Sequence, residues 1–290
     1  MRVGVIGNRG YEGLPEVLST LLDQAKALGV ELCIEEDIHD LAQGGECMEI
    51  PKNLDAMLTL GGDGTLLRGA RLLDGQEVPI LGINLGRLGF LTACGLDELP
   101  QALERLAAGE FRAEPRMRLD GRVYDLEGDQ RKQWSAVNDI VLHKGGFARV
   151  VQLRVAVNGE IIAAYAADGI VIATPTGSTA YSLSAGGPVV VPTVESIVLT
   201  PISAHALAIR PLVLPPTAEI AVQAEDGPEE LLVTVDGQVG TTFSAGETLA
   251  VKRDAHPVKL VRFPGMTFFT RMRRKLGWGG LAERDGHYRS

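Results

Sequence analysis

The chain has 290 residues, of which 45% are hydrophobic and 22% charged, as is typical of a soluble globular protein large enough for two hydrophobic cores. A formal net charge of −9 argues against nonspecific binding to nucleic acid, and no apolar run reaches the roughly 18–20 residues that span a bilayer. Three cysteines without paired metal-ligand spacing favour reduced thiols and a cytoplasmic location.

The first 110 residues alternate between predicted strands and helices. Strands are expected at 3–6, 30–35, 56–60 and 78–84, and helices at 15–28, 66–73 and 96–108. This alternation predicts a parallel sheet covered by helices on both faces, in which ligands bind at the carboxyl ends of the strands. Asp63, Arg87 and Phe90 lie at such ends. The spacing Gly4-x-x-Gly7-x-x-Gly10 departs from G-x-G-x-x-G and argues against a Rossmann dehydrogenase.

The most informative stretch of this half runs from Leu58 to Leu67. It joins a short buried strand, the turn Gly61-Gly62-Asp63-Gly64 and a helix for which Thr65 is the predicted N-cap. Such a helix start is an anion site, in which a carboxylate is unfavourable unless it holds a metal ion or takes a proton from a nucleophile. Asp63 therefore favours phosphoryl transfer, and Arg68 is placed to reach a phosphate. The alternative is a tight strand-to-helix connection in which Asp63 only caps the helix.

From Phe111 to about Phe263 nearly every segment has strand character. Asn158-Gly159, between 152–157 and 160–167, is a strong signal for a type I′ hairpin turn. Further strands are expected at 136–143, 170–174, 197–199, 220–224, 231–235, 248–252 and 258–263. Together these segments predict an all-β second domain, either a sandwich or stacked sheets.

The C-terminal segment from Met266 to Trp278 has a helical pattern and is expected to return to the first domain. Its basic residues are expected mostly to form a solvated face: Arg271, Arg273, Arg274 and Lys275. The polar tail after Gly279 is expected to fray. The predicted organisation is therefore a parallel α/β domain formed by residues 1–110 and 264–290, and a β-rich, sandwich-like domain formed by residues 111–263.

A second unusual loop follows the predicted strand at 170–174. That strand runs into Pro175-Thr176-Gly177, and six Ser and Thr hydroxyls fall between Thr174 and Ser184. Ser178 is the predicted cap of a short helix. A dense set of hydroxyls with one aromatic ring suits a nucleoside whose ribose is hydrogen-bonded and whose base stacks on Tyr181. The alternative is a loop whose hydroxyls are solvated.

The two loops resemble those of the NAD kinase family, and three further segments support the resemblance: 136–142, 235–238 and 268–278. It covers roughly residues 55–280, and lipid kinases of the same superfamily lack the run from Thr174 to Tyr181. The resemblance implies transfer of the terminal phosphoryl group of ATP, or of polyphosphate, to the 2′-hydroxyl of the adenosine ribose of NAD. It also implies a homodimer or homotetramer. Mg²⁺ is expected to bridge the donor phosphates, since a chain of net charge −9 lacks the excess of Lys and Arg needed to neutralise them.

Site residues are carried over from the family by matching positions. Asp63 matches the proposed catalytic base, with Gly62, Gly64 and Arg68 near the phosphates, and Gly61 is also expected to bring its N–H close to them. Asn138 and Asp139 match the pair that binds the adenosine ribose hydroxyls. Further dinucleotide contacts are expected from Arg149, Asp168, Thr179, Ala180, Tyr181, Ser182, Leu183, Ser184 and Gln238. Phe90 is added because it lies at a strand end. No side chain is assigned as a metal ligand.

Two other functions stay open at this point. A lipid or other small-molecule kinase would phosphorylate a non-nucleotide alcohol and would not respond to NAD. A non-catalytic regulator would bind a dinucleotide without turnover, although such a protein has no use for Asp63 beside phosphates. The residues do not distinguish ATP from polyphosphate as donor, or NAD from NADH as acceptor.

Overall fold

The computed structural model describes residues 1–86, 89–145, 150–206, 208–226, 231–265 and 267–278. It divides the chain into two units, the first comprising Met1–Pro115 with Lys259–Ser290 and the second Arg116–Val258. The predicted domain boundaries, after residues 110 and 263, lie within a strand's length of these positions. The strands β7 (Arg112–Arg116) and β20 (Val258–Arg262) belong to the sheet of the first unit, although their sequences have the strand character of the second.

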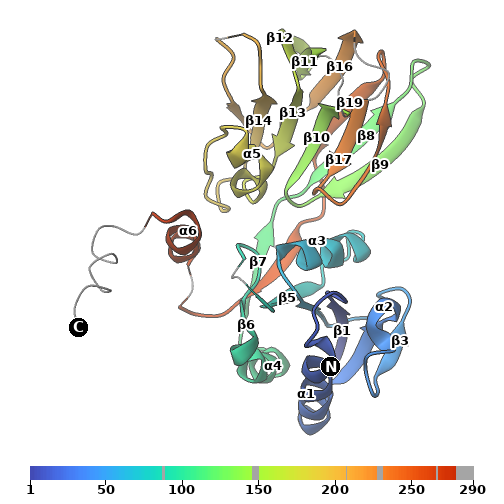
Figure 1. The fold of residues 1–290 in the computed structure, drawn as a ribbon, viewed down its shortest axis with the longest axis vertical. Coiled ribbons are helices and arrows are strands. Elements are labelled where there is room, and N and C mark those ends of the chain that lie inside the picture. Colours follow the sequence, from blue (N-terminus) through green and yellow to red (C-terminus); the bar gives the residue numbers. More distant parts are fainter. Residues whose placement is uncertain (87–88, 146–149, 207, 227–230, 266, 279–290) are drawn as a thin grey trace. The chain divides into compact units, whose positions relative to one another are not determined.

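The first unit is built on a sheet with the strand order β3-β2-β1-β4-β5-β20-β7 and with β6 beside β5 (Figure 1), in which the strands from β3 to β20 and β6 pair in parallel. Its other strands are β1 (Arg2–Gly7), β2 (Glu31–Glu35), β3 (Glu46–Met48), β4 (Ala56–Leu60), β5 (Pro79–Asn84) and β6 (Cys94–Gly95). Every residue of β4 is buried, as expected for a central strand of a sheet that is covered on both faces.

The helices of the first unit are α1 (Leu14–Leu28), α2 (Glu36–His39), α3 (Asp63–Leu72), η1 (Leu96–Glu98), α4 (Leu99–Ala107) and α6 (Phe268–Leu276). As predicted, α1 ends at Gly29, which adopts the left-handed conformation at φ 66°. The prediction that Thr65 caps α3 is wrong, because the helix already begins at Asp63 with Gly62 as N-cap. The Thr65 side chain instead packs where a Cβ of Gly61 would lie. Within the ranges that the structure describes, no helix is long and apolar enough to cross a membrane.

The second unit consists of two antiparallel sheets with the orders β15-β14-β13-β10-β17-β18 and β12-β11-β16-β19-β8-β9. Their bounds are β8 (Leu119–Tyr124), β9 (Gln130–Ala136), β10 (Asp139–Lys144), β11 (Val151–Val157), β12 (Glu160–Ala167), β13 (Gly169–Ala173), β14 (Ile197–Ile202), β15 (Leu212–Leu214), β16 (Ile220–Asp226), β17 (Leu231–Val235), β18 (Val239–Phe243) and β19 (Thr248–Arg253). Apolar side chains from both sheets form one core between them, which confirms the predicted sandwich.

Two details of the second unit bear on the site. Asn158 and Gly159 have φ values of 52° and 84°, as a type I′ turn requires, and join β11 to β12. The strand predicted at 136–143 is divided, because β9 ends at Ala136 and β10 begins at Asp139. The backbone between them leaves both ladders and is free to take other partners.

The sheet that contains β10, β13 and β14 is buried on both faces. One face contributes to the sandwich core, and the other packs Val141, Val171 and Val198 against Val190. Val190 follows the short helices η2 (Gly177–Thr179) and α5 (Tyr181–Ser184) in the chain. The second unusual loop of the sequence is therefore anchored on this sheet.

Candidate active site

Asn138 and Asp139, the predicted ribose-binding pair, lie in the break between β9 and β10 and are held by one side chain. Asp236 Oδ1 accepts hydrogen bonds from the backbone N–H groups of Asn138 at 2.7 Å and Asp139 at 3.2 Å. Its Oδ2 accepts from the N–H of Val137 at 3.1 Å, and its own N–H donates to the Asp139 carbonyl at 2.9 Å. Asp236 thus fixes the backbone of the pair. In the sequence, Asp236 stands out only as a member of the segment 235–238, which supports the family resemblance.

The Thr174–Gly177 turn packs directly on the same backbone. The Thr174 N–H donates to the Asn138 carbonyl at 2.8 Å, and the Thr174 hydroxyl donates to the Val137 carbonyl at 2.6 Å. A Cβ at Gly177 would overlap the Asn138 backbone, so only glycine allows this close approach. The structure therefore brings together two motifs that are far apart in the sequence.

The Asp139 carboxyl group is 4% exposed and accepts a hydrogen bond from the backbone N–H of Tyr181. Burial, and then repulsion by Asp236, raise the pKa of Asp139 to about 7, while the Tyr181 N–H opposes this shift. The Tyr181 side chain is 46% exposed and is available for stacking. The Tyr181 backbone thus binds the buried Asp139 carboxyl group, while the Tyr181 ring is exposed. This arrangement suits a ribose and its base.

Most hydroxyls of this loop are bonded within the second unit rather than offered to solvent. The acceptors are the carbonyls of Val137 for Thr174, Pro175 for Ser178 and Thr176 for Thr179, and Ser182 shares a hydrogen bond with Thr200. The prediction that Ser178 caps a short helix is wrong, because Ser178 lies inside η2 and the N-cap of α5 is Ala180. Ser178 Oγ instead accepts from the Val190 N–H at 2.9 Å. These hydroxyls hold the turn in shape, and Ser184 is exposed.

The other predicted residues of the second unit are arranged around its strand ends. Asp168 forms an ion pair with Lys144 at 2.7 Å. Ala180 and Leu183 are half-buried, and Gln238 is exposed in the turn after β17. Arg149 lies outside the described residues, as do Arg87, Met266 and the tail after Gly279.

In the first unit, Asp63 is the first residue of α3, and its carboxylate is bound by the segment that follows β5. Oδ2 accepts from the Phe90 N–H at 2.8 Å and Oδ1 from the Leu91 N–H at 2.9 Å. A Cβ at Gly89 would overlap this carboxylate, so glycine is required there. A carboxylate offers about four lone-pair sites, so these two bonds leave capacity for a further donor or a cation.

Arg68 is held at the carboxyl ends of β1 and β2. It is ion-paired with Glu35 and donates to the Gly7 carbonyl at 2.8 Å. The other Glu35 carboxylate oxygen is buried and has no hydrogen-bond partner in the described part of the chain, so removal of Arg68 would leave an uncompensated charge. The expectation that Gly61 offers its N–H to a phosphate is wrong, because that group donates to the Ile83 carbonyl. Gly62 and Gly64 are exposed at the start of α3.

The C-terminal helix α6 packs on the first unit, as predicted. The Phe90 ring lies 6.2 Å from that of Phe268, and the Lys275 ammonium is 5.7 Å from the Phe90 ring centroid. The expectation of a solvated basic face is confirmed for Arg273, Arg274 and Lys275 but wrong for Arg271. Arg271 is buried because its guanidinium donates to backbone carbonyls of the Phe90–Ala93 segment.

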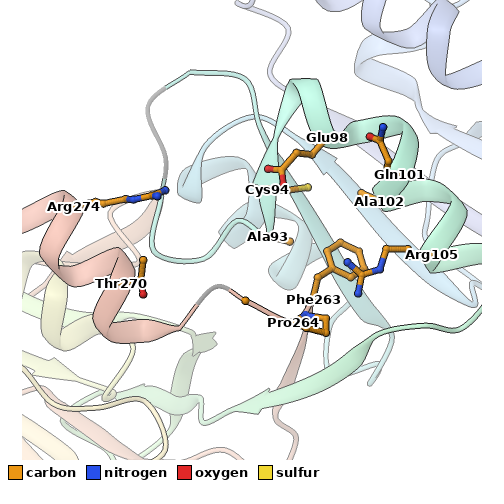
Figure 2. A pocket seen from close by; sticks show the side chains of 11 residues that line it. Ala93, Cys94, Glu98, Gln101, Ala102, Arg105, Phe263, Pro264, Thr270 and Arg274 are labelled. Atoms are coloured by element: carbon orange, nitrogen blue, oxygen red, sulfur yellow. The ribbon is translucent and has the colours of Figure 1, made fainter.

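A cavity of about 250 Å³ adjoins this segment (Figure 2). Thr270 and Arg274 of α6 line one side of it, and η1 and α4 line the other. The Arg105 guanidinium lies over the Phe263 ring, 4.2 Å from its centroid. Burial raises the pKa of the Cys94 thiol to about 12, so this thiol stays protonated at neutral pH. None of the residues predicted for the site lines this cavity.

Comparisons with known proteins identify the family. Residues 3–111 match the ATP-NAD kinase N-terminal domain, and residues 137–263 match the ATP-NAD kinase C-terminal domain. The NAD kinase of Gemmatimonas aurantiaca is 63% identical over 286 residues, which are 99% of either chain. Two solved structures are also similar. The yeast NADH kinase, solved as a complex with NADH, has a TM-score of 0.85 and 27% identity and covers 97% of this chain and 88% of its own. An NAD kinase from Archaeoglobus fulgidus in complex with ATP has a TM-score of 0.75 and 28% identity, with coverage of 97% and 100%. The chain therefore belongs to the NAD kinase family of enzymes.

Proposed function

We propose that the chain transfers the terminal phosphoryl group of ATP, or of polyphosphate, to the 2′-hydroxyl of the adenosine ribose of NAD. The observation that carries the proposal is the arrangement of Asn138, Asp139 and Tyr181, which joins a buried carboxylate to an exposed ring. The relatives solved with NADH and with ATP support a dinucleotide acceptor and a nucleotide donor.

In this proposal the second unit holds the acceptor. Asn138 and Asp139 accept hydrogen bonds from the ribose hydroxyls, and the base stacks on Tyr181. Asp63 of the first unit takes the proton of the 2′-hydroxyl. Because a carboxylate is a weak base for a sugar hydroxyl, the proton moves late, and positioning contributes more than basicity.

The donor phosphates are expected at the start of α3, where the helix dipole and the backbone of Gly62 and Gly64 favour an anion. The residues present also fit Mg²⁺, since Asp63 keeps acceptor capacity beyond its two N–H bonds. One carboxylate, donor phosphates and water form a ligand set that this ion accepts. When bound, Mg²⁺ neutralises charge on the donor phosphates.

Several family-based expectations belong to the same proposal. Asp168, Gln238, Phe90 and the loop 179–184 contact the dinucleotide, and the enzyme works as a homodimer or homotetramer. A cytoplasmic location is supported by the three cysteines, which are free: Cys33, Cys47 and Cys94.

The proposal is tested by measuring NADP formation from NAD with Mg²⁺ and either ATP or polyphosphate. Asp63→Asn is expected to lower kcat by about 10²–10⁴, the usual contribution of a positioned base, with NAD affinity retained. Asp23→Asn, at an exposed position of α1, is the matched control and should leave kcat unchanged. If neither donor gives NADP, calorimetry with NAD then separates a dinucleotide-binding regulator, which binds, from a kinase of another alcohol, which does not.

A further inference from the structure

Two buried arginines hold the backbone segment that binds the Asp63 carboxylate. Arg262 Nη1 donates to the carbonyls of Leu91 at 2.6 Å and Thr92 at 3.1 Å, and its Nη2 reaches the Phe90 carbonyl at 3.4 Å. Arg271 Nη1 donates to the carbonyls of Phe90 at 2.9 Å and Thr92, and its Nη2 to Ala93 at 3.3 Å. The arginines are 7% and 3% exposed, so these bonds are largely shielded from water.

One peptide group connects a guanidinium to the carboxylate. The Phe90 carbonyl accepts from Arg271, and the N–H of the same peptide group, that of Leu91, donates to Asp63 Oδ1 at 2.9 Å. A peptide that accepts a charged donor at its oxygen is polarised and becomes a stronger donor at its nitrogen. The positive charge of Arg271 therefore acts on Asp63 through a single amide.

Burial of two guanidinium groups is costly unless their donors are satisfied and their charge is compensated. Here both groups converge on the carbonyls of the short segment Phe90–Ala93, and the Arg262 guanidinium also lies 4.0 Å from the Glu114 carboxylate. Gly89, immediately before this segment, leaves room for the Asp63 carboxylate and for no side chain of its own. The whole arrangement fixes one carboxylate at the start of α3.

We propose that Arg271, with Arg262 beside it, is a positioning residue for phosphoryl transfer, because it holds the backbone segment whose Phe90 and Leu91 N–H groups orient the Asp63 carboxylate. This inference rests on the proposed role of Asp63 as base. It makes α6 a functional element of the first unit, although neither arginine touches substrate in this proposal.

The first experiment compares Arg271→Lys with Arg273→Lys. Lysine keeps the charge but cannot reproduce the planar fork of donors on several carbonyls. Arg271→Lys is expected to lower kcat by up to about 10²-fold, the effect of a small misplacement of a reacting group, with the Kd for NAD unchanged. Arg273 is exposed on the same helix, and its variant should keep the native kcat. A native kcat in Arg271→Lys would overturn the inference.

A double-mutant cycle separates positioning from a purely structural effect. In the Asp63→Asn background, Arg271→Lys should cause little further loss of kcat, because the group that it positions is already absent. An equal loss of kcat in both backgrounds would overturn the inference. If Asp63→Asn alone keeps the native kcat, the role of Asp63 in the proposed function fails first, and this outcome is distinct from the other two.

A second variant covers the case in which Arg271→Lys does not fold, as judged by its thermal unfolding. Arg262→Lys removes the guanidinium group that donates to the Leu91 and Thr92 carbonyls and leaves Arg271 in place. It is expected to lower kcat in the native background and not in the Asp63→Asn background. Loss of kcat in both backgrounds, or in neither, would count against the positioning role.

Discussion

Ionisation of the Asp139 carboxyl group is expected to make both stability and activity depend on pH. Its pKa is raised from the ordinary value of 3.8 to about 7, first by burial and then by Asp236. The folded protein therefore binds this proton more tightly than the unfolded chain does. The contribution of Asp139 to the free energy of unfolding is fully present below pH 3.8 and is expected to be lost as pH rises from there to about 7, because ionisation of a buried carboxyl group is unfavourable.

Activity is expected to follow pH in the opposite direction. A ribose hydroxyl donates more strongly to a charged carboxylate than to a neutral carboxyl group, so kcat/KM for NAD should rise as pH increases through about 7. Measured with saturating donor, this profile reports the enzyme form that has bound the donor but not NAD. Asp139→Asn should have a lower kcat/KM and should lose this rise. A variant that keeps the native profile would assign the titration to another group.

At the scale of single residues, the side chains with a chemical role could be predicted from the sequence, but their hydrogen-bond partners could not. Asp63 was noticed because a carboxylate is unusual in a glycine turn, whereas its bonds to Phe90 and Leu91 depend on tertiary structure. Burial of Arg271 was missed for the same reason, since a basic run on a helix carries no local signal of which member meets carbonyls. Asp236 was visible only within a turn motif.

The loop from Thr174 to Ser184 shows at the scale of an element how a serine-rich segment becomes rigid. Ser178 is fully buried, donates to the Pro175 carbonyl at 2.6 Å and accepts from the Val190 N–H at 2.9 Å. Ser178→Ala leaves the Val190 N–H without this acceptor and is expected to lower the free energy of unfolding by about 1–3 kcal/mol. Denaturant unfolding measures the difference.

Ser184→Ala is the matched control for that substitution, because Ser184 lies in the same loop and is exposed. Its free energy of unfolding should remain close to that of the native chain. Equal destabilisation by both substitutions would mean that the Ser178 bonds do not carry the effect.

Elements with a strong local pattern were the most predictable. The helix ended by Gly29, the buried strand β4 and the Asn158-Gly159 hairpin are set by periodicity and turn chemistry. Bounds that depend on distant residues were not predictable. The break between β9 and β10 is such a case, because Asp236 from the turn after β17 binds its N–H groups. The start of α3 is a local error, because Thr is a common N-cap but Gly62 holds that position here.

At the scale of the whole molecule, the two units differ in how the chain builds them. The second is one continuous stretch, Arg116–Val258, with its own core between two sheets. The first is discontinuous, because β20 inserts between β5 and β7 after the second unit is complete. Arg262 and Arg271, which hold the Phe90–Ala93 segment, also come from this late part of the chain.

A chain that ends at Val258 should therefore retain a folded second unit and an incomplete first one. Its parallel sheet lacks β20 between β5 and β7, and the carbonyls of Phe90–Ala93 lose both guanidinium donors. Limited proteolysis is expected to cut within residues 1–115 and to spare residues 116–258. Protection of the first unit equal to that of the native chain would show that β20 adds little to it.

The place of β20 after the second unit also bears on folding during synthesis. Domains usually fold in the order in which they emerge, but here the N-terminal unit includes β20, which is translated only after the second unit. The edges of β5 and β7 that pair with β20 stay open while more than a hundred further residues are added. An open strand edge is prone to wrong pairing. The second unit can thus fold first, and the carboxylate proposed as the base is fixed only after Arg262 and Arg271 have been added.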